Sequence, residues 1–494
     1  MAEQTEAVAF LSRGAEEVFT THISQVFLKG ETAWKLKRAV RFAYVDYTAL
    51  AARKAFCETE LALNRRTAPS LYKRVRALSR AADGGLEWDG PGAPVDYVLE
   101  MRRFPDDALF DRMAAQGTLT PALLRELTDA IAAFHAQAEI VQAGGLKAVI
   151  AGNAERLVAC CPPLPRKAVA ALNKAALAAY AKHEALLASR AAGGRVRRCH
   201  GDLHLGNILL LDGHPALFDC IEFSDEFACI DVLYDLAFLL MDLLHRGDAA
   251  GACLVANRYL DVSGDEGGLV LLPLFISMRA AIRAHVCVAQ GKSEAALAYL
   301  ALAARALRPA APCLLAVGGV SGSGKSTLAA ALAPHIPPLP GARVLRSDVL
   351  RKRLAGVAPE MRLPDSAYTK AAGTHVYAHM LALAEAALRA GWCVILDAAF
   401  LQKTERDAAA ALAARLGVAF AGFWLDAPDA ILVPRLAARR SDASDAGIEV
   451  LRAQRRNAEP ATQWHRIDAA RPLAAQCEEA LHGLPPSDAA MPAG

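Results

Sequence analysis

The feature that most constrains this chain is a glycine-rich segment that joins an apolar run to a helix-forming run. Residues 319–326 read GVSGSGKS and fit the pattern G-x-x-x-x-G-K-[ST] in full. The pattern needs a strand before it and a helix after it, because the loop N–H groups and the helix N-terminus bind phosphates together. Residues 313–317 are apolar, and an Ala-rich run follows the motif. The sequence therefore predicts a nucleoside triphosphate site, for ATP with Mg²⁺.

Each part of this loop has an expected task. Lys325 would reach the β- and γ-phosphates, and the Ser326 hydroxyl would bind Mg²⁺. The predicted phosphate-binding residues are Gly319, Ser321, Gly322, Ser323, Gly324, Lys325, Ser326 and Thr327.

Two carboxylates follow predicted strands in the same part of the chain. Asp397 ends the apolar run 393–396, where a carboxylate that supports Mg²⁺ is expected. Asp348 follows the predicted strand 343–347 and is a candidate base for a substrate hydroxyl. Either residue has a second interpretation as a helix cap, Asp397 before 404–416 and Asp348 before 349–354.

Basic residues on a later helical segment are candidates for stabilising transferred phosphate. Arg435 and Arg439 lie on the predicted helix 430–440, and a mobile arginine can stabilise the charge that develops. A solvated basic face is the alternative. This part of the chain resembles small P-loop kinases that phosphorylate hydroxyl groups of small molecules or sugars.

The length of 494 residues predicts more than one domain. The run 308–312, RPAAP, cannot continue a helix, so we expect domains at 1–310 and 313–484. Strands and helices alternate after 313, which predicts a parallel sheet covered by helices and an α/β multidomain chain. In the first domain we expect strands at 26–28, 33–40 and 95–103 and a helix at 47–66. Residues 485–494 lack apolar periodicity and are expected to be a disordered tail.

Composition excludes several other classes. The net charge of +3 gives no electrostatic case for a nucleic-acid or membrane partner, and it does not indicate an oligomeric state. The 11 cysteines include no CxxC pair, which argues against zinc and disulfides. No signal peptide is evident, the apolar run 230–244 contains three aspartates, and the run 269–278 is short. We expect a soluble cytoplasmic protein.

A second motif lies in the first domain. Residues 198–209 read RCHGDLHLGNIL, and Asp202 and Asn207 have the spacing of the kinase pattern H-R-D-L-x-x-x-N. Twelve residues after Asn207, Asp219 ends a short apolar run. This spacing predicts that Asp202 is the base and that Asn207 and Asp219 bind metal.

The form His200-Gly201-Asp202 is similar to aminoglycoside phosphotransferases and choline-kinase-like enzymes, and so is the later run 231–237, DVLYDLA. The resemblance implies a two-lobed, protein-kinase-like α+β fold in which Asp235 supports the catalytic loop. A zinc site at His200 and His204 is the weaker interpretation, and a buried hydrogen-bonding role is preferred for His200.

The same resemblance assigns an ATP-positioning lysine to the run 33–37, AWKLK. Lys35 and Lys37 point to one face because strand side chains alternate, and Lys37 is slightly favoured. Glu60 is the expected partner, with Glu58 second. A surface salt bridge is the alternative for either pairing.

As a whole, the chain resembles bacterial proteins described as bifunctional aminoglycoside phosphotransferase and ATP-binding proteins. The resemblance implies that both domains hold ATP–Mg²⁺ and transfer phosphate to small-molecule hydroxyl groups. Two alternatives remain open: a P-loop switch that regulates one active kinase, and an N-terminal pseudokinase fused to an active P-loop kinase. An aminoglycoside acceptor would need an acidic surface, for which Glu222, Asp225, Glu226 and Asp231 are candidates.

Overall fold

The computed structural model describes residues 2–42, 45–142, 145–438 and 443–484. The chain forms two compact units, Met1–Val149 with Glu184–Asp242, and Ile150–His183 with Leu243–Gly494. The predicted tail 485–494 and Arg439 lie outside the described residues. The domain boundary expected between 310 and 313 stays a prediction.

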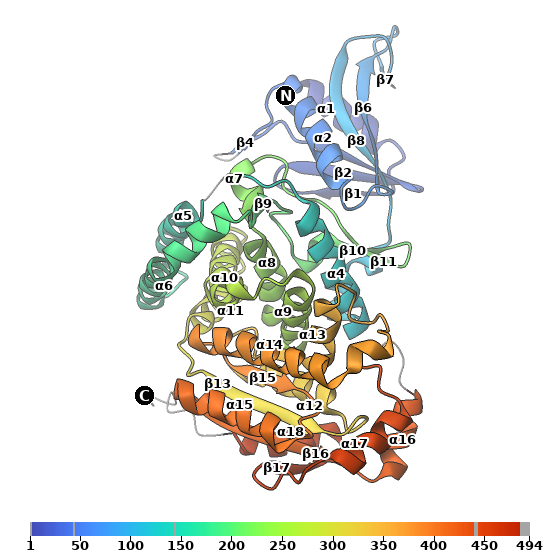
Figure 1. Cartoon of the computed structure of the whole chain (residues 1–494). Coiled ribbons are helices and arrows are strands. Elements are labelled where there is room, and N and C mark those ends of the chain that lie inside the picture. Colours follow the sequence, from blue (N-terminus) through green and yellow to red (C-terminus); the bar gives the residue numbers. More distant parts are fainter. Residues whose placement is uncertain (1, 43–44, 143–144, 439–442, 485–494) are drawn as a thin grey trace. The chain divides into compact units, whose positions relative to one another are not determined.

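The first unit begins with a six-stranded antiparallel sheet (Figure 1). Its strands, in spatial order, are β1 (Glu17–Thr20), β2 (Ser24–Lys29), β3 (Thr32–Lys37), β8 (Pro94–Arg102), β6 (Tyr72–Arg80) and β7 (Leu86–Trp88). Helix α2 (Leu50–Asn64) contacts β8 and β6. The strands expected around residues 26, 35 and 98 and the helix at 47–66 are confirmed, with ends shifted by a few residues.

The rest of this unit is mainly helical, with short strand pairs between the helices. The helices are α1 (Ala2–Ser12), α3 (Phe110–Ala115), α4 (Pro121–Gln137), α7 (Asp225–Ala228) and most of α8 (Val232–His245). The pairs are β4 (Arg41–Phe42) with β5 (Val45–Asp46), β9 (Val196–Arg198) with β12 (Cys229–Asp231), and β10 (Ile208–Leu211) with β11 (His214–Leu217). The loops beside β9 and β11 carry the residues of the predicted kinase motif.

The second unit contains a five-stranded parallel sheet, as expected from the alternation in sequence. Its order is β14 (Arg343–Arg346), β15 (Val394–Asp397), β13 (Cys313–Gly319), β16 (Ala419–Asp426) and β17 (His465–Asp468). Alternate residues of β13 enter different cores, because strand side chains point to opposite faces. Leu314 and Ala316 lie in one core, and Leu315 and Val317 lie in the other. Figure 1 shows the helices that cover the sheet.

The helices that belong with this sheet alternate with its strands. They are α12 (Lys325–Leu332), α13 (Ser347–Leu354), α14 (Lys370–Arg389), α15 (Lys403–Leu416), α16 (Asp429–Ala438), α17 (Ile448–Asn457) and α18 (Leu473–His482). The same unit holds α9 (Ala249–Ser263), the 3₁₀ helix η3 (Glu266–Leu271), α10 (Leu272–Ala289) and α11 (Ser293–Ala306). Two of the borders between the units, at residues 149/150 and 183/184, fall within helices α5 (Leu146–Ala159) and α6 (Arg166–Ala192).

Helix α9 covers the open edge of the parallel sheet at β14. The Asn257 side chain accepts a hydrogen bond from the Val344 N–H at 2.8 Å and donates one to the Ala342 carbonyl at 3.1 Å. Its amide therefore occupies the place of a neighbouring strand and satisfies an edge that would otherwise be unpaired. Cys253, one turn earlier, lies in the core of the sheet.

A buried arginine of β14 also joins the sheet to α9 and η3. The Arg343 guanidinium is 1% exposed and lies 2.6 Å from Asp261 and 3.3 Å from Glu266. Burial lowers the pKa of Arg343, but the two carboxylates outweigh it and raise the pKa above its usual value. The positive charge is therefore kept inside the protein by α9 and η3.

One segment, Glu266–Ala289, is long and apolar enough to cross a membrane, and 67% of its most apolar window is buried inside the protein. It is longer than the apolar run considered from the sequence because it continues past Arg279. Burial of this extent is typical of a core helix in a folded domain.

Replacing Arg343 with Met should destabilise the second unit by about 3 kcal/mol, because Asp261 and Glu266 lose their buried partner. Arg389→Met is the matched control: its pair with Glu385 is exposed and should contribute less than about 1 kcal/mol. Urea unfolding, with hydrogen exchange of β14 amides, measures both. Equal stability of the two variants would contradict the role given to Arg343.

Candidate nucleotide and phosphotransfer sites

The catalytic loop after β9 is held by one buried carboxylate from α8. Asp235 is fully buried and accepts the backbone N–H groups of His200 and Gly201 at 3.0 and 2.9 Å. His135 of α4 lies 3.1 Å from the same carboxylate. The predicted support role of Asp235 is consistent with these contacts.

His200 also has the structure of a buried support. It is fully buried, and its Nε2 lies 2.9 Å from the Phe218 carbonyl. Burial lowers the pKa of His200, so the ring is held neutral. His204 uses its Nδ1 to accept the Gly206 N–H, which argues against a shared zinc ion.

The predicted base and metal ligand lie side by side. The Asn207 amide donates to the carbonyl and to the carboxylate of Asp202, each at 2.9 Å. Asp242 of α8 accepts the Leu205 N–H at 3.1 Å and fixes the turn between them. Asp242 was not identified from the sequence. Only its position two helical turns after Asp235 could have indicated it, since that spacing puts both carboxylates on one face.

Asp219 sits on a constrained backbone at the end of β11. Its φ is +60°, a conformation that non-glycine residues rarely adopt. Its N–H donates to the Tyr72 hydroxyl at 3.0 Å, and the next N–H, of Cys220, donates to Asn64 at 2.9 Å. The side chain remains 43% exposed, which leaves the carboxylate accessible to a ligand.

Both lysines of β3 contact Glu60 of α2. Lys35 lies 2.7 Å from one carboxylate oxygen, and Lys37 lies 2.6 Å from the other. Burial raises the pKa of Glu60, but the two ammonium groups outweigh burial and lower it to about 2. Glu58 instead faces Lys54 on the exposed side of α2, at 3.8 Å. The surface salt bridge considered for Glu60 is excluded, because Glu60 is fully buried.

The P-loop joins β13 to α12 as the motif predicts. Gly319, Gly322 and Gly324 have φ values of +140°, +84° and +90°. A Cβ on Gly319 would lie 2.4 Å from the Leu425 carbonyl oxygen, so only glycine fits there. The Lys325 ammonium donates to the Val320 carbonyl at 3.0 Å, across the loop.

The carboxylate at the end of the neighbouring strand β15 faces this loop. Asp397 is 4% exposed, lies 3.3 Å from Arg346, and is hydrogen-bonded by Ser326. Helix α15 has Gln402 at its N-cap, so the capping interpretation of Asp397 is wrong. Burial raises the pKa of Asp397 despite the positive charges of Arg346 and Lys325.

Asp348 lies in the first turn of α13 and is half-buried. Its interpretation as an N-cap is wrong, because Arg346 occupies that position without a side-chain cap. Burial is the main cause of the raised pKa of Asp397, and the negative charge of Asp348 adds a minor contribution. The role of Asp348 as a base stays a prediction.

Helix α17 brings a further residue to the P-loop. The Gln454 side chain of α17 accepts the Ser321 N–H at 2.7 Å, a contact that no sequence motif indicates. Arg435 of α16 is exposed. Arg455 of α17 bonds Asp426 at 2.7 Å and Asp429 at 3.1 Å and is therefore held by carboxylates.

The side chains present suit ATP–Mg²⁺ in both units. Hard oxygen donors, which Mg²⁺ prefers, meet at Ser326 and Asp397 in the second unit. In the first unit Asn207 and Asp219 carry such oxygens, Asn207 beside Asp202 and Asp219 beside Lys35. The Ser323 hydroxyl is buried and has no hydrogen-bond partner within the described part of the chain. A phosphate oxygen in the P-loop is a suitable acceptor for it.

A second cluster has metal-ligand side chains but a different role. His135, Cys199 and Asp235 lie within 4.8 Å of one another and are all buried. The Asp235 oxygens already accept two backbone N–H groups, so this cluster is explained by support of the catalytic loop.

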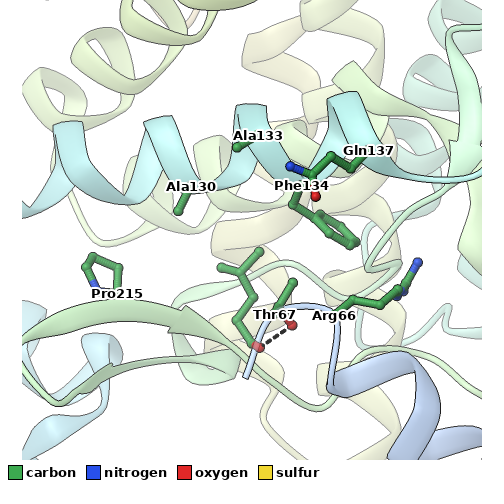
Figure 2. Close-up of a pocket in the computed structure, with 8 residues that line it drawn as sticks. Arg66, Thr67, Ala130, Ala133, Phe134, Gln137 and Pro215 are labelled. Atoms are coloured by element: carbon green, nitrogen blue, oxygen red, sulfur yellow. Dashed lines mark hydrogen bonds between the residues drawn. The ribbon is translucent and has the colours of Figure 1, made fainter. Parts of the chain in front are cut away.

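A surface hollow of 180 Å³ lies in the first unit (Figure 2). Residues of α4, including Phe134, line it together with Pro215 and Leu217. The Thr67 hydroxyl donates to the Leu217 carbonyl at 2.7 Å, and Arg66 donates to the Arg198 carbonyl. Thr67 and Arg66, which line the hollow, thus bind the backbone at the ends of β11 and β9. No predicted catalytic residue is among the residues that line it.

Comparison with known protein families matches two segments of the chain. Residues 29–267 match the phosphotransferase enzyme family, and residues 314–461 match an AAA domain family. Among solved structures, a gluconokinase from Sinorhizobium meliloti is 25% identical, covers 35% of this chain and 91% of its own, and has a TM-score of 0.25. A complex of aminoglycoside 2'-phosphotransferase-IIIa is 14% identical, covers 62% of this chain and 96% of its own, and has a TM-score of 0.39.

The match to curated proteins extends over almost the whole chain. An uncharacterized protein of Mycobacterium tuberculosis is 32% identical over 486 residues, which is 94% of this chain and 95% of that protein. A protein of Mycobacterium bovis matches equally. The chain belongs to the same family as these proteins, and in it an aminoglycoside-phosphotransferase-like domain precedes a P-loop kinase-like domain.

Proposed function

We propose that the protein is an ATP-dependent phosphotransferase with two active sites, each of which transfers the γ-phosphate to a hydroxyl group of a small molecule. The observation that carries the proposal is the convergence, within the first unit, of Asp202 beside Asn207 and of Lys35 beside Asp219. These are the positions that kinase chemistry needs for a base, metal ligands and a phosphate-binding cation. We further propose that it works in the cytoplasm without a nucleic-acid or membrane partner.

In the first unit, Asp202 would orient the acceptor hydroxyl and accept its proton. Asn207 restrains the Asp202 carboxylate, and Asp235 fixes the backbone that carries both residues. Preorganisation of this kind lowers the barrier because the carboxylate need not rearrange during transfer. Asn207 and Asp219 would hold Mg²⁺.

In the second unit, the P-loop N–H groups and Lys325 would bind the phosphates, and Ser326 with Asp397 would hold Mg²⁺. Asp348 would accept the proton of the acceptor. Bound ATP–Mg²⁺ supplies the phosphoryl group and neutralises its charge.

The first test of the N-terminal site is Asp202→Asn. Transfer of label from γ-labelled ATP into one class of product in a small-molecule extract should fall by about 10²–10⁴-fold, because the base is lost. ATP binding should persist, since Asp202 is not a phosphate ligand. Asp107→Asn, an exposed aspartate on the same unit, is the control and should retain full transfer.

The corresponding test of the C-terminal site is Lys325→Ala. A different product should lose label by about 100-fold or more, because one preorganised phosphate contact is removed. Lys167→Ala replaces an exposed lysine and should have no effect.

The pattern of labelled products distinguishes two active kinases from one kinase with a P-loop switch. Products that disappear separately in the two variants support two kinases. Label released only as free phosphate, and abolished by Lys325→Ala, would contradict transfer in the second unit and favour a P-loop switch. An unchanged product profile in both variants would refute the proposal.

A further inference from the structure

The two lysines of β3 differ in what they contact beyond Glu60. Lys35 lies 2.5 Å from Asp219, whose carboxylate is 43% exposed. Lys37 pairs with Glu222, which is 6% exposed, and is itself 1% exposed. Lys35 therefore lies at the open end of the charged cluster and Lys37 at its closed end.

The closed end has a third member. The Tyr47 hydroxyl donates to Glu222 at 2.9 Å, and the Lys37 ammonium lies 5.1 Å from the centre of the Tyr47 ring. Tyr47 is fully buried. Ion pairs to Glu60 and Glu222 and a cation–π contact with Tyr47 thus enclose the Lys37 ammonium, which is 1% exposed. A nucleotide phosphate has no access to an ammonium group that is enclosed in this way.

We propose that Lys37, with Glu222 and Tyr47, is a positioning cluster that holds one oxygen of Glu60 so that the other oxygen directs Lys35 toward the nucleotide phosphates. This inference rests on the proposed phosphotransfer in the first unit. It reverses the slight preference for Lys37 as the phosphate-binding lysine, which the alternation of strand side chains could not decide.

The charges of the cluster are consistent with a phosphate-binding role for Lys35 and a positioning role for Lys37. Two ammonium groups face three carboxylates, Glu60, Glu222 and Asp219. Pairing Lys37 with Glu222 and Lys35 with Glu60 leaves the Asp219 carboxylate for Mg²⁺. Burial lowers the pKa of Lys37, but Glu60 and Glu222 outweigh it and hold the pKa above its usual value. Lys37 is therefore a permanent charge rather than a proton carrier.

Loss of Lys37 would change how Glu60 holds Lys35. Glu60 and Glu222 would both be buried without their shared cation, and the Lys35 ammonium would be the remaining cation for Glu60. The ammonium would then be drawn from Asp219 toward both oxygens of Glu60. Neutralising Glu222 at the same time removes a negative charge that Lys37 no longer compensates. The displacement of the Lys35 ammonium should therefore be smaller.

The test uses the full chain with Lys325→Ala in every variant, so that the P-loop does not contribute nucleotide turnover. Lys35→Met should lower kcat/KM for ATP by about 100-fold or more, because the phosphate contact is lost. Lys37→Met should lower kcat/KM by about tenfold to a hundredfold through misplacement of Lys35. Lys37→Met with Glu222→Gln should recover part of that loss. Lys54→Met, on the exposed side of α2, should match the parent.

The assays are made at a temperature at which circular dichroism shows every variant to be folded, so that a role in stability alone would leave kcat/KM unchanged. Native kcat/KM in Lys37→Met would overturn the inference. A larger loss in Lys37→Met than in Lys35→Met would also overturn it, since Lys37 would then be the phosphate-binding lysine. A parent that neither binds nor turns over ATP would instead refute the proposed function of this unit, and the inference with it.

Discussion

The buried carboxylate of Asp235 is the interaction on which the first unit depends. A charge with no exposed surface is costly unless hydrogen bonds satisfy it, and Asp235 obtains two of these from the backbone N–H groups of His200 and Gly201. The loop cannot move without exposing that charge to an unfavourable environment. The same loop carries Asp202 and Asn207, and the His200 ring extends the restraint to the Phe218 carbonyl, next to Asp219. One helix residue therefore anchors the loop that carries Asp202 and Asn207, and through His200 that loop also contacts the residue before Asp219.

The parallel sheet of the second unit is completed by a helix that lies before the P-loop along the chain. The prolines at 309 and 312 predict a domain border between this helix and the sheet, and that border stays a prediction. Yet Asn257, far before that point, completes the edge of β14, and Arg343 of that strand is neutralised by Asp261 and Glu266. The edge strand leads directly to Asp348 through Arg346. Helix α9 is thus part of the framework that positions the predicted acceptor site, although it precedes the P-loop motif along the chain.

Local patterns predicted those parts of the sites whose geometry is set by neighbouring residues. The P-loop is specified by its glycines, and Asp202, Asn207 and Asp219 by their spacing, so both could be identified without the fold. Contacts between distant segments could not. Lys35 and Lys37 are equivalent in strand periodicity, and contacts with distant residues, Asp219 for Lys35 and Glu222 for Lys37, distinguish them. Gln454 reaches Ser321 from a helix more than a hundred residues later, and neither residue type nor spacing indicates it.

Glu60 and Asp397, buried carboxylates of the two predicted nucleotide sites, differ in a way that bears on their tasks. Glu60 is paired with two lysines, so its pKa falls to about 2 although burial opposes this. Asp397 is buried to a similar degree, but burial prevails and its pKa is raised, because Arg346, Lys325 and Ser326 compensate its charge only in part. The negative charge of Asp397 is therefore under-neutralised, and a divalent cation between Asp397 and the phosphates would supply the missing positive charge. Glu60 has no such deficit and serves as a fixed anchor. Two buried carboxylates thus differ in how far the surrounding positive charges compensate them, and this difference fits the separate tasks proposed for Glu60 and Asp397.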